Sequence, residues 1–125
     1  MASRFHILIV EDEPLIVEVL EGTLEAAYRV SSANTVGQAL AFLRTSHVDL
    51  ILLDSILPDG RSAEVASAAE RLGAVVIQMS GYPQVMGEFQ CSERLFLCKP
   101  FGPELLLTTI EAALHNGGEA DTATL

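Results

Sequence analysis

An apolar run that ends in a single acid constrains this chain most strongly. Residues 48–53 read Val-Asp-Leu-Ile-Leu-Leu, and the run stops at Asp54, shortly before the turn-forming sequence Pro58-Asp59-Gly60. A near-continuous apolar run of this length is typical of a buried strand in a parallel sheet. The carboxyl ends of such strands border the ligand crevice in open α/β folds. Asp54 is therefore a candidate functional residue, whereas Asp59 and Gly60 are interpreted as turn residues.

Three further apolar runs end in polar side chains in the same way. The residues that end them are Glu11 with Asp12, Ser80, and Lys99. Equivalent ends of neighbouring parallel strands meet at one edge of the sheet. An acid pair, a hydroxyl and a lysine at these positions therefore predict one shared site with Asp54.

The segments between the runs are predicted to be helices, because their apolar residues recur at helical spacing. Thr35 and Gln38 predict a capping box at the second helix, and Gly73 predicts the end of the third. A segment interrupted by Pro83 and Gly87 predicts a short or irregular fourth helix. The apolar stripe expected on the first helix comprises Leu15, Ile16, Val19, Leu20 and Leu24.

Five strand–helix units with short connections predict the fold class. It is α/β, a doubly wound five-stranded parallel sheet with helices on both faces. The common, flavodoxin-like strand order is 2-1-3-4-5. This order places the ends of strands one and three side by side, so that Glu11, Asp12 and Asp54 converge, with Ser80 and Lys99 on their flank.

Length and charge narrow the function classes. A chain of 125 residues is expected to form one domain, here 1–116, followed by a frayed tail at 117–125. Seven basic residues against 17 acidic ones give a net charge of −10, which argues against a basic surface that binds nucleic acid. Without a membrane-spanning stretch or a signal peptide, the protein is expected to be cytoplasmic, with no membrane contact.

The predicted acid cluster suggests a specific chemistry. Three carboxylates in one crevice repel one another unless a cation lies between them, and hard oxygen ligands suit Mg²⁺. A carboxylate such as Asp54 can also attack phosphorus and form an acyl phosphate. Lys99 and the Ser80 hydroxyl can then neutralise and hydrogen-bond the phosphoryl oxygens.

Four segments, in order, resemble the receiver domain of bacterial two-component response regulators, of the stand-alone, single-domain type. They are residues 8–14, 54–60, 79–82 and 99–101, and the likeness extends from residue 5 to about residue 114. The resemblance also implies a cis peptide bond between Lys99 and Pro100. The implied roles are phosphoacceptor for Asp54, metal site for Glu11, Asp12, Asp54 and the Ile56 carbonyl, switch hydroxyl for Ser80, phosphate-pairing lysine for Lys99 and switch aromatic for Phe96.

The function implied by the resemblance is a phosphorylation-dependent signalling switch rather than an enzyme. A histidine kinase or a phosphotransfer protein donates a phosphoryl group to Asp54 with Mg²⁺ bound, and a downstream protein partner reads the changed surface. Because nothing follows the fifth helix, we expect no output domain and no contact of this chain with nucleic acid. A switch, a phosphorelay intermediate that passes the phosphoryl group on, and a phosphate sink remain open.

Several positions depart from the family pattern. Ser62 stands where a glycine is usual, the interval from Ser80 to Lys99 is short, and Phe96 lacks a tyrosine hydroxyl. The segment 82–93 is expected to be mobile without phosphate. Ile56 and Tyr82, each two residues after a site residue, cannot act as bases, so we predict slow loss of the phosphoryl group.

Three other functions are alternatives to the phosphorylation switch. An aspartyl-phosphate phosphohydrolase of the haloacid-dehalogenase type needs an acid two residues after its nucleophile, where this chain has Ile56. A flavin site would need a phosphate loop rich in Gly, Ser and Thr after the first strand. A phosphorylation-independent adaptor remains an alternative, although such a protein has no need of the complete acid, hydroxyl and lysine set.

Overall fold

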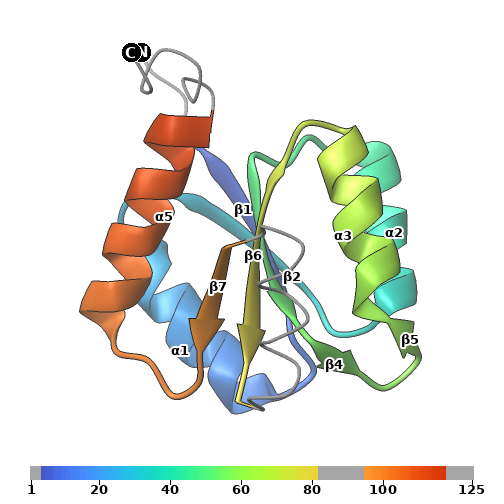
Figure 1. Cartoon of the computed structure of the whole chain (residues 1–125), viewed down its shortest axis with the longest axis horizontal. Coiled ribbons are helices and arrows are strands. Elements are labelled where there is room, and N and C mark those ends of the chain that lie inside the picture. Colours follow the sequence, from blue (N-terminus) through green and yellow to red (C-terminus); the bar gives the residue numbers. More distant parts are fainter. Residues whose placement is uncertain (1–3, 82–94, 118–125) are drawn as a thin grey trace.

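The fold of this chain is described by a computed structural model for residues 4–81 and 95–117 (Figure 1). The strands of the main sheet are β1 (His6–Val10), β2 (Arg29–Ala33), β3 (Leu50–Asp54), β6 (Val75–Ser80) and β7 (Leu95–Cys98). The helices are α1 (Pro14–Leu24), α2 (Val36–Thr45), α3 (Ser62–Arg71) and α5 (Pro103–Gly117). Two short strands, β4 (Ile56–Leu57) and β5 (Gly60–Arg61), form a separate antiparallel pair.

All pairings in the main sheet are parallel, in the order β2-β1-β3-β6-β7. Numbered by the five sheet strands alone, this is 2-1-3-4-5, so the predicted fold class and strand order are confirmed. Val10 pairs with Leu53, and Asp54 pairs with Met79. The register therefore places the residue after Val10, which is Glu11, beside the end of β3.

Helices cover both faces of the sheet, with α1 and α5 on one side and α2 and α3 on the other (Figure 1). The all-buried strands β1 and β3 contribute alternate residues to the two cores, as in any sheet covered on both faces. On α1 the predicted apolar stripe is wrong for Leu15 and Val19, whose side chains are 74% and 67% exposed. Only the part of the stripe that faces the sheet is packed, where Leu20 and Leu24 share a core with residues of the strands. A helix that covers a sheet turns only one side toward it, so the rest of a wide stripe stays exposed.

The predicted cap of α2 is present in a modified form. The Thr35 hydroxyl accepts a hydrogen bond from the Gln38 amide at 3.0 Å, as in a capping box. The Gln38 side chain, however, accepts from the amide of Asn34 at 2.9 Å rather than from Thr35. At the end of α3, Gly73 adopts a φ of 88°, which is the left-handed conformation that glycine tolerates.

The hairpin β4–β5 was not predicted, because its residues were interpreted only as a turn. The expected fourth helix at 82–93 lies outside the described residues, as does the tail expected at 117–125 except for its first residue, which ends α5. Within residues 4–81 and 95–117, no helix is both long enough and apolar enough to cross a membrane.

Candidate functional site

Three acids meet at the carboxyl edge of the sheet. Glu11, Asp12 and Asp54 each place one carboxylate oxygen so that these atoms all lie within 4.8 Å of one another. Glu11 is fully buried and Asp54 is 8% exposed, whereas Asp12 is exposed to solvent. The predicted convergence of the three acids is present, because strand order and register bring the ends of β1 and β3 together.

Backbone contacts hold Glu11 in this position. Its amide donates to the Ala33 carbonyl at 3.0 Å, which extends the pairing of β1 with β2 by one residue. One of its carboxylate oxygens accepts a hydrogen bond from the Glu13 amide at 3.2 Å. The first acid after β1 therefore faces the site, and Glu13 itself makes no side-chain cap at the start of α1.

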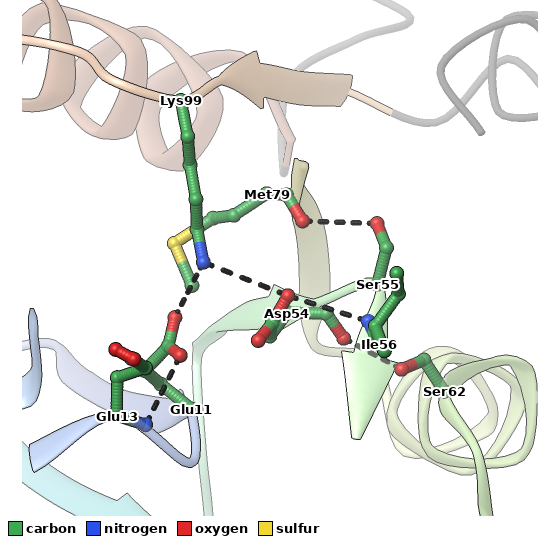
Figure 2. Close-up of polar contacts among 8 residues, drawn as sticks. All are labelled: Glu11, Glu13, Asp54, Ser55, Ile56, Ser62, Met79 and Lys99. Atoms are coloured by element: carbon green, nitrogen blue, oxygen red, sulfur yellow. Dashed lines mark hydrogen bonds and ion pairs between the residues drawn. The ribbon is translucent and has the colours of Figure 1, made fainter. Parts of the chain in front are cut away.

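Lys99, the only lysine of the chain, reaches this acid cluster from the end of β7. Its ammonium lies 2.8 Å from Glu11 Oε1 and 3.6 Å from Asp54 Oδ1 (Figure 2). The Lys99 amide donates to the Ser80 carbonyl at 2.8 Å, so the pairing of β6 with β7 aligns the lysine with the site. The peptide bond between Lys99 and Pro100 is cis, as the family resemblance implied.

Burial and like charge set the protonation behaviour of the site. Burial, followed by the nearby Glu11 carboxylate, raises the pKa of Asp54 from 3.8 to about 6, and the Lys99 ammonium only partly offsets this. For Lys99, burial alone would lower the pKa. The hydrogen bond to Glu11 and the charges of Asp54 and Glu11 outweigh that effect and raise the Lys99 pKa.

The site opens to solvent through a cleft of about 480 Å³. Ile56, whose side chain is 52% exposed, lies at its rim, and its amide donates to Asp54 Oδ1 at 3.3 Å. The residues that line the cleft are Glu11, Asp12, Glu13, Ile16, Asp54, Ile56, Gly81 and Lys99. The cleft therefore gives a ligand in solution direct access to the three carboxylates and the ammonium.

The two predicted switch residues lie on neighbouring strands. Ser80 ends β6 and is 2% exposed, one residue beyond the pair formed by Met79 and Asp54. Phe96 is half-buried on β7 and pairs with Gln78 of β6. Paired residues of adjacent strands point to the same face of a sheet, and so do residues two apart on one strand. Phe96 is paired with Gln78, and Gln78 lies two residues before Ser80. Ser80 and Phe96 therefore point to the same face of the sheet.

Two serines support Asp54 and were not predicted to do so. The Ser62 hydroxyl, buried at the start of α3, donates a hydrogen bond to the Asp54 backbone carbonyl (Figure 2). Both the amide and the hydroxyl of Ser55 donate to the Met79 carbonyl at 2.9 Å. The departure from glycine at position 62 was the one sequence signal for the first of these contacts.

The donor set of the site fits a hard divalent cation. Carboxylate oxygens are the ligands that Mg²⁺ prefers, and three of them converge here with a single ammonium. The cluster therefore keeps an excess of negative charge that a divalent cation can neutralise. A carboxylate that lines the cleft beside such an ion and a lysine, as Asp54 does, can also serve as a nucleophile toward phosphorus.

Comparisons with known proteins agree with this geometry. Residues 7–111 match the family described as the response regulator receiver domain. The chain is 32% identical over 124 residues to the phosphate regulon transcriptional regulatory protein PhoB of Pseudomonas aeruginosa, covering 93% of this chain and 54% of that protein. It is 30% identical over 121 residues to the sensory transduction protein LytT of Enterococcus faecalis, covering 92% and 50%. The chain thus spans about half the length of these relatives.

Solved structures show the same relationship. A CheY-like response regulator receiver domain protein from Methanospirillum hungatei superimposes with a TM-score of 0.84 at 29% identity, covering 94% of this chain and 99% of that one. The family match spans most of the chain, and the strand order is the one predicted for a receiver domain. This chain is a member of the response regulator receiver domain family of two-component signal transduction.

Proposed function

We propose that Asp54 accepts a phosphoryl group in a Mg²⁺-dependent reaction, and that the modified domain acts as a signalling switch for a protein partner. The observation that carries this proposal is the convergence of Glu11, Asp12 and Asp54 within 4.8 Å, with the Lys99 ammonium 3.6 Å from Asp54 Oδ1. These are the groups that a phosphoryl transfer to a carboxylate requires.

The metal would be held by the carboxylates of Glu11, Asp12 and Asp54 together with the backbone carbonyl of Ile56. When bound, Mg²⁺ supplies positive charge that neutralises phosphoryl oxygens during transfer. The pKa of Asp54 is raised to about 6 but stays below neutral pH. The carboxylate is therefore mostly ionised at neutral pH and can act as a nucleophile.

The donor is a phosphohistidine of a histidine kinase or of a phosphotransfer protein. One oxygen of the Asp54 carboxylate attacks phosphorus, a new P–O bond forms, and the P–N bond to the imidazole breaks with its electron pair returning to nitrogen. Lys99, which now pairs with Glu11 at 2.8 Å, turns to a phosphoryl oxygen. The Ser80 hydroxyl donates a hydrogen bond to another.

The switch follows from the position of two side chains. Movement of Ser80 toward the phosphoryl group vacates space on its face of the sheet. The half-buried Phe96 on the neighbouring strand turns into that space, which changes the surface that a partner contacts. Without a hydroxyl, Phe96 makes this change through packing alone.

The phosphoryl group is expected to be lost slowly. Ile56 lies at the rim of the cleft and has no group that can orient or deprotonate an attacking water. Replacing Ile56 and Tyr82 together by small polar residues should therefore shorten the half-life of the phosphorylated protein. An unchanged half-life in that double variant would contradict the prediction.

Intact mass measurement after incubation with Mg²⁺ and a small-molecule phosphodonor tests the proposal. We expect one added phosphoryl group in the wild-type protein, and none in Asp54→Ala or in a sample treated with a chelator. Glu18→Gln removes an exposed acid of α1 that is not part of the carboxylate cluster. This control variant should be phosphorylated like the wild type.

The outcomes separate the remaining alternatives. An adduct on Asp54 that transfers to a histidine phosphotransfer protein would identify a relay intermediate. No adduct and no Mg²⁺ binding would overturn the proposal in favour of a phosphorylation-independent adaptor. A stable adduct that alters binding of a downstream protein would support the switch.

A further inference from the structure

The tip of the β4–β5 hairpin is tied to a helix that is remote in sequence. Asp59 Oδ1 accepts a hydrogen bond from the Val36 amide at 2.7 Å, and Asp59 Oδ2 accepts from the Gly37 amide at 3.0 Å. These two amides open α2, where backbone N–H groups have no partner within the helix. One carboxylate at the hairpin therefore satisfies two of them at once, and the same amides lower the pKa of Asp59.

Helix α2 also has a local cap, so the contact from Asp59 is an addition to it. The third amide of the first turn, that of Gln38, already bonds to the Thr35 hydroxyl at 3.0 Å. Thr35 precedes the helix directly, whereas Asp59 lies 23 residues after Val36. The local cap can start the helix without any help from the hairpin, whereas the Asp59 side chain links the hairpin to the helix by two hydrogen bonds.

Packing between the hairpin and α2 supports this attachment. Leu57 of β4 is buried in the same core cluster as Val36. A Cβ atom placed on Gly60 would lie 3.5 Å from the Val36 side chain, and one placed on Gly37 would lie 3.5 Å from Asp59 Oδ2. The two backbones therefore approach closely around the Asp59 carboxylate.

The anchored hairpin carries a backbone group of the candidate metal site. Ile56 pairs with Arg61 and Leu57 pairs with Gly60, so the turn that holds Asp59 closes the strand that holds Ile56. The start of this loop is fixed by Ser55, which bonds to β6. A charge-assisted contact at the tip restrains the loop from its other end.

We propose that Asp59 is a positioning residue for the metal site, which acts by fixing the β4–β5 hairpin to α2 and so holding the Ile56 carbonyl in place. This inference rests on the proposed function, because it takes that carbonyl as a metal ligand. Mg²⁺ demands near-ideal octahedral geometry. A carbonyl on a loose hairpin would therefore bind the ion less well than one that is held.

The test compares two variants that each remove an acceptor from the first turn of α2. Asp59→Ala removes the contact to the hairpin, and Thr35→Ala removes the local cap. The measurement is the Mg²⁺ dissociation constant by calorimetric titration, together with the urea unfolding curve of each variant. We expect Asp59→Ala to weaken Mg²⁺ binding about tenfold, the lower end of the range for groups that orient metal ligands. Thr35→Ala should leave Mg²⁺ affinity within about twofold of the wild type.

Asp59→Ala also removes a negative charge, which weakens the attraction of Mg²⁺. Two controls distinguish this charge effect from the loss of the hydrogen bonds that anchor the hairpin. Titrations are repeated at about 0.5 M salt, where exposed charges are largely screened. Asp59→Asn is also neutral but keeps one acceptor oxygen, so its Mg²⁺ affinity should lie between those of the wild type and Asp59→Ala. It also serves as the working variant if Asp59→Ala does not fold.

The outcomes distinguish this inference from the function on which it rests. If the wild type binds no Mg²⁺, both fall. If the wild type binds Mg²⁺ and Asp59→Ala loses no more affinity than Thr35→Ala, Asp59 only caps a helix and the proposed function stands. Amide resonances provide a second test. During Mg²⁺ titration of the wild type, the resonances of Val36 and Gly37 should shift, and the midpoint of these shifts should equal the midpoint of Mg²⁺ binding. Unmoved resonances would overturn the inference.

Discussion

The two edges of the sheet both carry buried polar groups, yet they are built differently. At the amino edge, the ring of His6 donates from Nδ1 to the His47 carbonyl at 2.9 Å, and its Nε2 lies 2.8 Å from the Ser31 hydroxyl. The His6 amide donates to Asp49 Oδ2 at 2.8 Å, and the Asp49 amide donates back to His6. Each donor there meets an acceptor of the same network.

At the carboxyl edge the balance is unequal. Three carboxylates face one ammonium, and burial together with the Glu11 charge raises the pKa of Asp54 to about 6. The polar groups of the amino edge are thus paired with one another. The carboxyl edge, in contrast, keeps excess negative charge that a cation from solution can neutralise. This contrast separates a structural polar network from a functional one.

The largest effect is expected at the amino edge. His6→Ala removes a buried ring that packs edge-on against Phe42 with ring centroids 5.6 Å apart, and it removes the hydrogen bonds to the Ser31 hydroxyl and the His47 carbonyl. We expect the free energy of unfolding to fall by about 3 kcal/mol, measured by urea denaturation. Mg²⁺ affinity should stay unchanged in the folded protein. A parallel loss of Mg²⁺ affinity would break the separation of the two edges.

At the carboxyl edge, a substitution is expected to raise the free energy of unfolding rather than lower it. The Asp54 pKa is raised in the folded protein, so the wild type loses stability as pH rises from about 4 through about 6. Without divalent cations, Asp54→Asn should therefore stabilise the protein at pH 8 by roughly 1–2 kcal/mol, allowing for solvent screening. The gain should shrink toward pH 5 and also when Mg²⁺ is added. Equal gains at pH 5 and pH 8 would exclude the like-charge explanation.

Gln78 offers a third test, of intermediate size. Its side chain is fully buried on β6, two residues before Ser80, and neither of its polar side-chain atoms has a hydrogen-bond partner among residues 4–81 and 95–117. Gln78→Met keeps the shape and removes the unmet polar atoms, so it should stabilise the unphosphorylated protein by about 1 kcal/mol. Thermal and urea unfolding measure this change. Destabilisation would show that the Gln78 side chain makes stabilising hydrogen bonds, as the polar groups of the amino edge do.

The smallest effect is expected for the exposed part of the amino edge. The His47 ring lies 3.0 Å from Asp49 Oδ1, but its side chain is 78% exposed. Exposed pairs of this kind contribute little, so His47→Gln should change the free energy of unfolding by less than about 0.5 kcal/mol. The His47 carbonyl, which is the group that His6 needs, is unaffected. A loss as large as that of His6→Ala would show that the two rings act together.

Much of the site could be predicted because it depends on strand order. Buried apolar runs have to form a parallel sheet covered on both faces, and short right-handed connections leave few possible orders. Once the order is set, residues just beyond the strands become neighbours, which is how Glu11, Asp54 and Lys99 could be grouped. The cis bond at Pro100 came from family resemblance rather than from physical reasoning.

Contacts that depend on side-chain geometry were missed. Ser62 bonds to the Asp54 carbonyl, and Asp59 bonds to α2, although both were interpreted only as parts of a loop or turn. The exposed Leu15 and Val19 were expected to face inward, because helical spacing alone does not say which part of a wide apolar stripe meets the sheet.

The five strands of the main sheet, their parallel order, and the meeting of three acids with a lysine at one edge could be read from the amino-acid sequence, since these follow from which segments must be buried. The side chains that restrain that site became apparent only in the folded structure. The Asp59 anchor, the Ser62 contact and the network of His6 join residues that are 8 to 43 positions apart. Such bonds form only where packing has already brought a donor to within hydrogen-bond distance of an acceptor, and apolar patterning carries no record of that distance.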